Sequence, residues 1–85
     1  MSTLIELPNI GKDTVNELRA AGIQTVEQLK ELGSKKAWLE LQKVDSSVCL
    51  HRLLGLEGAI QGIPKKMISA EVKAELREFF EKNKR

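Results

Sequence analysis

The chain has 85 residues, a formal net charge of +2 and one cysteine, Cys49. This length fits one small domain, and a single cysteine excludes an internal disulfide. Leucine, alanine, glutamate and lysine are abundant whereas tyrosine is absent, a composition that favours helices over strands. We therefore predict one all-α domain over residues 1–85, a compact bundle of about five helices.

The positive charge is slight and unevenly placed. Residues 1–44 hold six cations and six anions, so the excess lies in the second half, chiefly at Lys82, Lys84 and Arg85. A domain so close to neutral does not favour strong, charge-driven wrapping of DNA, although weak phosphate contacts stay open. The sequence has neither a charged-plus-apolar leader nor a run of about eighteen apolar residues, so we expect a cytoplasmic protein without membrane contact.

The first recognisable motif follows a short lead-in. Residues 1–7 are mostly apolar and predict one helical turn or an extended segment. Residues 7–12 read LPNIGK, which is the layout of a helix-hairpin-helix turn. Pro8 fixes its own φ and Gly11 tolerates φ values that a residue with a Cβ resists, so the pair allows a tight turn. Where such a hairpin normally has its first glycine this chain has Asn9, which visits positive φ more readily than most residues.

A turn of this kind presents backbone N–H groups at the start of the following helix. These donors and the positive end of the helix dipole form a site for an anion, usually a nucleic-acid phosphate in such hairpins. The candidate nucleic-acid-binding residues are Asn9, Ile10, Gly11 and Lys12. Asp13 and Glu17 follow directly, so the segment has no basic excess, and the same pattern also serves to pack two helices without a ligand.

Apolar periodicity and capping residues predict the helices. The predicted ranges are 12–21, 25–32, 34–43, 47–61 and 70–82. Gly22 and Gly33 end the first two, Thr25 and Gln28 form a capping box, and Ser69 caps the last helix.

The helix predicted at 47–61 is apolar on more than one face and is expected to be central. Cys49 is predicted to be a small core residue there. Gly55, Gly58 and Gly62 share one stripe of this helix and predict that another helix crosses close by. The predicted core residues are Leu18, Ile23, Leu29, Trp38, Leu53, Ile60, Leu76 and Phe79.

No group of residues predicts catalysis or a metal site. Cys49 and His51 stand two positions apart, which points them to different faces of a helix, and the acidic residues occur singly among lysines. We expect a non-enzymatic protein with no cofactor, no metal and no small-molecule substrate.

The order of these residues resembles the C-terminal domain of the TfoX/Sxy family, bacterial regulators linked to natural competence. The resemblance runs from Leu4 to about Glu81. It is carried by LPNIGK at 7–12, AGI at 21–23, LKELG at 29–33, AW at 37–38, VCL at 48–50 and LEGAI at 56–60. The turn alone is also similar to the C-terminal domain of the bacterial RNA polymerase α subunit, whereas VCL and LEGAI are more specific. The resemblance implies a helical domain of a transcription regulator. Long family members also carry a separate N-terminal domain, for which we expect no room in these 85 residues.

Two functions from different classes stay open. The one ranked first is weak, sequence-independent contact with the backbone of duplex DNA through residues 9–12, with the tail at 82–85 adding diffuse attraction. The alternative is a protein-interaction module without DNA binding, which docks on a transcription component or on a second copy of itself. The near-neutral charge favours this alternative, whereas the turn and the family resemblance favour DNA.

Overall fold

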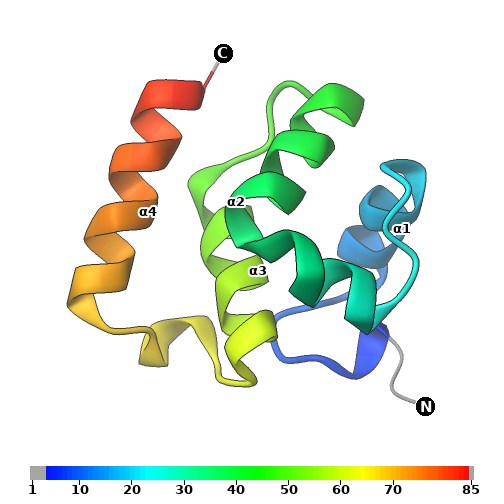
Figure 1. Ribbon diagram of the computed structural model, residues 1–85, viewed down its shortest axis with the longest axis horizontal. Helices are drawn as coiled ribbons and strands as arrows, with labels where there is room; N and C mark the ends of the chain where they lie inside the picture. The colour runs from blue at the N-terminus through cyan, green and yellow to red at the C-terminus, as the bar shows by residue number, and fades with distance from the viewer. Residues whose placement is uncertain (1–3, 85) are drawn as a thin grey trace.

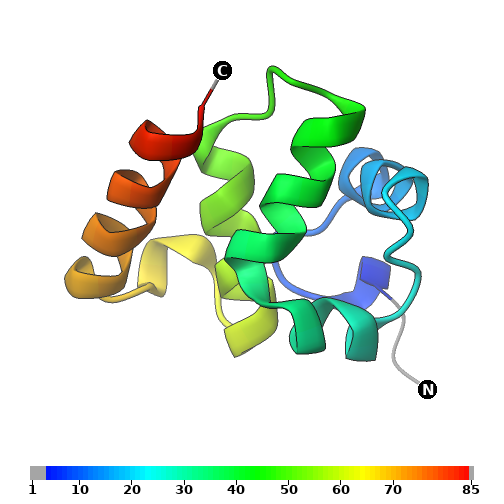
Figure 2. The same cartoon turned by 45° about the horizontal axis from the view of Figure 1, so that its top comes forward.

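The computed structural model describes residues 4–84, which contain four α helices and two short 3₁₀ helices. In chain order the elements are η1 (Leu4–Glu6), α1 (Lys12–Ala20), α2 (Val26–Val44), α3 (Leu50–Gln61), η2 (Lys65–Met67) and α4 (Ala70–Asn83). Helices α2 and α3 lie side by side in the centre, with α1 on one side and α4 on the other (Figure 1; Figure 2). No strand occurs in these residues, so the all-α class is confirmed.

The helix ends form as the local sequence predicts. After α1 the chain passes through Gly22 at φ 88°, and the N–H of Ile23 donates to the carbonyl of Leu18 at 2.8 Å. This is the Schellman arrangement, in which a left-handed residue lets the chain turn back and satisfy the last carbonyls of the helix.

Side chains cap the starts of α2 and α4. The Thr25 hydroxyl accepts from the N–H of Gln28 at 3.1 Å, and the Gln28 side chain accepts from the N–H of Thr25 at 3.2 Å. In α4 the Ser69 hydroxyl accepts from the N–H of Val72 at 3.2 Å. The predicted capping box and the predicted Ser69 cap are therefore confirmed.

The described residues count four α helices where about five were predicted, because α2 joins two helical segments across a kink. The predicted break at Gly33 is present, since this residue has non-helical angles (φ 83°, ψ 164°) between the predicted ranges 25–32 and 34–43. Glycine reaches this left-handed φ without a steric penalty, so the chain bends there and resumes the helix. The buried Ser34 hydroxyl donates to the Glu57 carboxylate of α3 at 2.7 Å and ties the kink to the neighbouring helix.

The helix predicted from residue 47 begins later, at Leu50. The Asp45 carboxylate accepts hydrogen bonds from the Ser47 hydroxyl at 2.6 Å and from the Ser47 N–H at 3.0 Å, which makes these residues a turn. Cys49 becomes the N-cap of α3 with an exposed side chain, so its predicted place in the core is wrong.

Trp38 lies at the centre of the core and has no exposed surface. Its Nε1–H donates to the carbonyl of Cys49 at 3.1 Å, and its ring meets Phe79 and Phe80 of α4 edge-on, with centroids 6.0 and 5.7 Å apart. The predicted core residues that the structure buries are Leu18, Ile23, Leu29, Trp38, Leu53 and Leu76. Ile60 and Phe79 are only partly buried; Phe79 belongs to α4, the outermost helix, and keeps one side open to solvent.

The glycine stripe of α3 faces a loop. A Cβ at Gly58 would lie 2.5 Å from Nδ2 of Asn9 and 2.8 Å from the carbonyl oxygen of Ile63, and a Cβ at Gly55 would lie 3.6 Å from Cβ of Asn9. Gly62, at φ 77°, has no such neighbour within 4 Å and ends the helix. A close approach is thus confirmed at Gly58, but the prediction that a helix makes it is wrong.

None of the helices in residues 4–84 has the length and apolar character needed to cross a bilayer.

Candidate nucleic-acid interface

The four predicted binding residues form a turn at the start of α1, called here the 9–12 turn. Asn9 adopts a left-handed φ of 67°, and Gly11 is the N-cap of α1 in an extended conformation with no side-chain cap. Ile10 is buried, and its N–H donates to the carbonyl of Leu7 at 3.4 Å. Ile10 therefore anchors the turn in the core and has no free N–H for a ligand.

Gly11 and Lys12 supply the exposed donors of the turn. Neither N–H has a backbone or side-chain acceptor within the described chain, and the Lys12 ammonium takes part in none of the ion pairs there. Asp13 follows in the first helical turn, where its carboxylate interacts favourably with the helix dipole and opposes a bound phosphate. The turn can accept an anion, but the nearby carboxylate weakens the attraction.

The Asn9 side chain has a structural role that the sequence did not indicate. Its Nδ2–H donates to the carbonyl of Ile63 at 3.0 Å, and its Oδ1 accepts from the N–H of Lys65 at 3.0 Å. This two-point contact fastens the 9–12 turn to the segment that leaves α3. Gly58 lies directly beneath it, where a side chain would collide with the amide.

A pocket of about 230 Å³ lies beside the 9–12 turn. It is lined by Asn9, Thr14, Cys49, His51, Arg52, Gly55 and Lys65. The Arg52 guanidinium donates to the Glu17 carboxylate at 2.7 Å and to the Thr14 hydroxyl, so its charge is neutralised within the fold. His51 and Lys65 are exposed and form no ion pair with another described residue.

The structure brings Lys65 next to the predicted site, with Lys66 following it in the chain, and sequence reasoning missed both. Their only local signal is a pair of lysines after Pro64, which says nothing about proximity to residue 9. In the tail, where diffuse attraction to DNA was predicted, Lys82 pairs with Glu78 at 3.0 Å. Lys84 is also paired, with a carboxylate of α4, and Arg85 lies outside the described residues.

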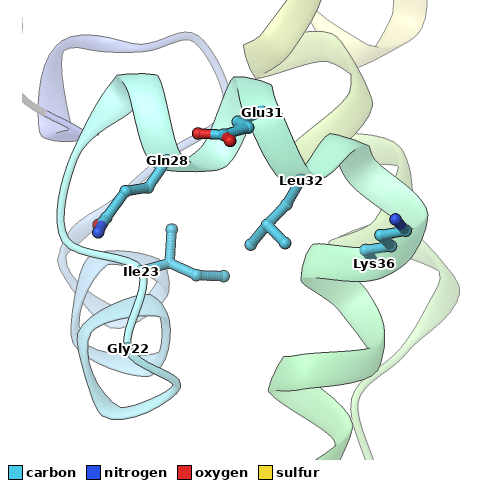
Figure 3. Close-up of a pocket in the computed structure, with 6 residues that line it drawn as sticks. All are labelled: Gly22, Ile23, Gln28, Glu31, Leu32 and Lys36. Carbon is cyan, nitrogen blue, oxygen red and sulfur yellow. The ribbon is translucent and has the colours of Figure 1, made fainter.

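A second pocket, of about 410 Å³, lies between the turn after α1 and the first half of α2 (Figure 3). Ile23 and Leu32 point toward one another across it, and the polar side chains of Gln28, Glu31 and Lys36 complete its lining. The lining combines apolar surface with both signs of charge. Such a surface suits a protein chain better than a phosphate.

In residues 4–84 no three His, Cys, Asp or Glu side chains come together in a way that could hold a metal ion. These features describe a small all-α domain with an exposed polar turn at the start of α1.

The TfoX C-terminal domain family matches residues 1–80, and the chain belongs to this family. It is also 37% identical over 76 residues to Protein Sxy of Escherichia coli (strain K12). That match covers 89% of this chain but 36% of Sxy, so the chain spans about a third of the length of this relative. TfoX/Sxy is a regulatory family and not a known enzyme family.

Two solved structures from Listeria monocytogenes share the fold. A crystal structure of an uncharacterized protein, in a triclinic form, has a TM-score of 0.94 and 46% identity, covering 95% of this chain and 92% of that one. A tetragonal form of a protein of unknown function has a TM-score of 0.90 and 46% identity, covering 92% and 96%. The fold is thus that of solved bacterial proteins of similar size.

Proposed function

We propose that this domain is a non-enzymatic regulatory module that contacts the backbone of duplex DNA through the 9–12 turn, weakly and without sequence preference. The observation that carries the proposal is the exposed start of α1, where Gly11 and Lys12 offer free N–H groups and an unpaired ammonium. The relation to TfoX/Sxy regulators supports a role in competence or transcription.

The binding is expected to be weak because the turn neutralises few phosphates. Its affinity should fall in the non-specific range, about 10⁻⁴ to 10⁻⁶ M, and should decrease with salt on a shallow slope. No side chain is assigned to base readout, so the affinity should depend little on DNA sequence.

An NMR titration with a short DNA duplex at two salt concentrations tests this proposal. Shifts should centre on Ile10, Gly11 and Lys12, and Lys12→Glu should abolish them while leaving the fold intact. Lys43→Glu, which makes the same change of charge in the last turn of α2, is the control and should keep the shifts. If the wild-type turn does not respond at low salt, or if Lys12→Glu binds as well as wild type, the contact does not exist.

The second candidate is a protein-interaction module, which the pocket between Ile23 and Leu32 favours. A transcription component or a second copy of the chain would then be the partner. In this case DNA leaves the spectrum unchanged, and shifts at the lining of that pocket follow protein concentration or an added partner.

A further inference from the structure

Two segments of the chain have a similar layout. Residues 9–12 read Asn-Ile-Gly-Lys and residues 62–65 read Gly-Ile-Pro-Lys. The first residue of each is left-handed, Asn9 at φ 67° and Gly62 at φ 77°, and the third is the N-cap of the next element. The fourth residue opens that element, so that Lys12 starts α1 and Lys65 starts η2. The second segment is called here the 62–65 turn.

The two turns lie against each other. The Asn9 amide pairs with the carbonyl of Ile63 and the N–H of Lys65, both at 3.0 Å, which fixes the 62–65 turn beside the 9–12 turn. The fit depends on Gly58, because a Cβ there would meet both Asn9 and Ile63 at less than 3 Å. The pocket of about 230 Å³ lies along this junction, with Asn9 and Lys65 in its lining.

The two turns and the residue that follows them carry three lysines without an ion-pair partner among the described residues. Lys12, Lys65 and Lys66 are exposed, and none of them forms an ion pair in the part of the chain that the structure describes. The Nζ of Lys73 donates to the carbonyl of Lys66 at 3.3 Å and adds a further cation nearby. By contrast, Arg52, which lines the pocket along this junction, is paired with Glu17.

We propose that the 9–12 and 62–65 turns form one bipartite interface for the phosphate backbone of a nucleic acid. Lys12 contacts phosphate from one turn, and Lys65 with Lys66 contacts phosphate from the other. The charges favour a polyanion, because unpaired lysines on two hydrogen-bonded turns can engage more than one phosphate of a backbone, whereas a single free anion would engage only one turn. This inference rests on the proposed function and extends it to residues that the turn motif does not contain.

The experiment measures the affinity for a fluorescent duplex DNA by anisotropy over a series of salt concentrations. The variants are Lys12→Gln, the double variant Lys65→Gln with Lys66→Gln, and a control double variant on α2, Lys30→Gln with Lys43→Gln. Each lost phosphate contact should reduce the slope of log affinity against log salt by about 0.9, so the 65/66 variant should lose up to about 2 and the control almost nothing. Circular dichroism checks that every variant keeps the wild-type fold.

The outcomes separate the two proposals. If the 65/66 variant keeps the wild-type affinity and slope whereas Lys12→Gln weakens both, the bipartite interface is wrong and the proposed function stands. If only the 65/66 variant weakens binding, contact through the 9–12 turn is wrong, and so is the bipartite arrangement. If wild type does not bind the duplex at all, both fail. If poly-glutamate binds to the same lysines as tightly as DNA does, the surface recognises an acidic polypeptide and the nucleic-acid assignment is overturned.

Discussion

The side-chain amide of Asn9 occupies the space that a Cβ atom on Gly58 would need, with Nδ2 2.5 Å from that position. A glycine inside a helix costs about 1 kcal/mol relative to alanine. Here the cost is offset by the close packing of the 9–12 turn on α3, which lets Asn9 reach Ile63 and Lys65. Gly58 therefore lowers the intrinsic stability of α3 but makes room for the hydrogen bonds that join Asn9 to Ile63 and Lys65.

Gly58→Leu should lower the free energy of unfolding by roughly 1 to 3 kcal/mol, because the new side chain overpacks this contact. The carbonyl of Ile63 would lie 2.8 Å from the new Cβ, and a backbone atom cannot move aside as the end of a side chain can. Urea unfolding followed by circular dichroism measures the change. The prediction is wrong if the midpoint equals that of wild type.

Gly55→Ala on the same stripe is the matched control. Its Cβ would meet Asn9 atoms at 3.6 and 3.8 Å, which are ordinary contacts. Since alanine favours the helix by about 1 kcal/mol, this variant should be as stable as wild type or slightly more stable. A loss as large as that of Gly58→Leu would show that the whole stripe is tightly packed.

Trp38→Phe should lower the free energy of unfolding by roughly 2 kcal/mol. The change removes the hydrogen bond to the carbonyl of Cys49 and leaves a cavity beside Phe79 and Phe80. Thermal unfolding by circular dichroism measures the effect. Val44→Ala, at a side chain that is 47% exposed, is the control and should change stability by less than about 0.5 kcal/mol. Equal effects from the two substitutions would contradict the central place of Trp38.

The Arg52–Glu17 pair should show a larger coupling energy than the Lys82–Glu78 pair. Its side chains are only 29% and 22% exposed, whereas those of Lys82 and Glu78 are 71% and 69% exposed. Double-mutant cycles to glutamine should give about 1 kcal/mol for the first pair and about 0.3 to 0.5 kcal/mol for the second. Equal couplings would indicate that burial adds nothing to the first pair.

Ser47→Ala should raise the pKa of Asp45 toward its ordinary value of 3.8. In the folded chain the Ser47 hydroxyl and then the Ser47 N–H, both donating to the carboxylate, hold this pKa below that value. A depressed carboxyl pKa stabilises the fold above the unfolded-state pKa, and this contribution is lost as the pH falls through the folded-state pKa. The stability difference between wild type and Ser47→Ala should therefore be fully present above about pH 4 and shrink in stronger acid.

NMR titration of the Asp45 carboxyl carbon measures this pKa directly. Ser46→Ala is the control, since no bond from Ser46 to that carboxylate is present, and it should leave the midpoint unchanged. An Asp45 midpoint that is the same in wild type and Ser47→Ala would refute the role of Ser47.

The features that sequence predicted well depend on residues close together in the chain. The capping box of Thr25 and Gln28, the Ser69 cap and the left-handed Gly22 each involve a few consecutive positions. Apolar periodicity likewise predicted α1 and α4 to within one residue at most, because one buried face sets their pattern.

The features that sequence missed depend on contacts between distant residues. The break predicted at Gly33 is present, but the bond between the buried Ser34 and Glu57 of α3, which ties this kink to its neighbour, has no signal in the local sequence. Asn9, whose side chain comes nearest to Gly58, lies more than forty positions away, and no local pattern reveals this contact. The exposed donors of the candidate site were predicted from the turn motif, whereas its likeness to residues 62–65 became visible only through the backbone angles.

The bond between Asn9 and the 62–65 turn also has a consequence for biosynthesis. While the chain grows on a ribosome, the Asn9 amide has no partner until Ile63 and Lys65 have emerged. The 9–12 turn thus reaches its final geometry only after the segment that follows α3 is available to it. A fragment cut short at the end of α3 would carry Lys12 without the lysines of the second turn, so translation must pass this point before the surface is complete.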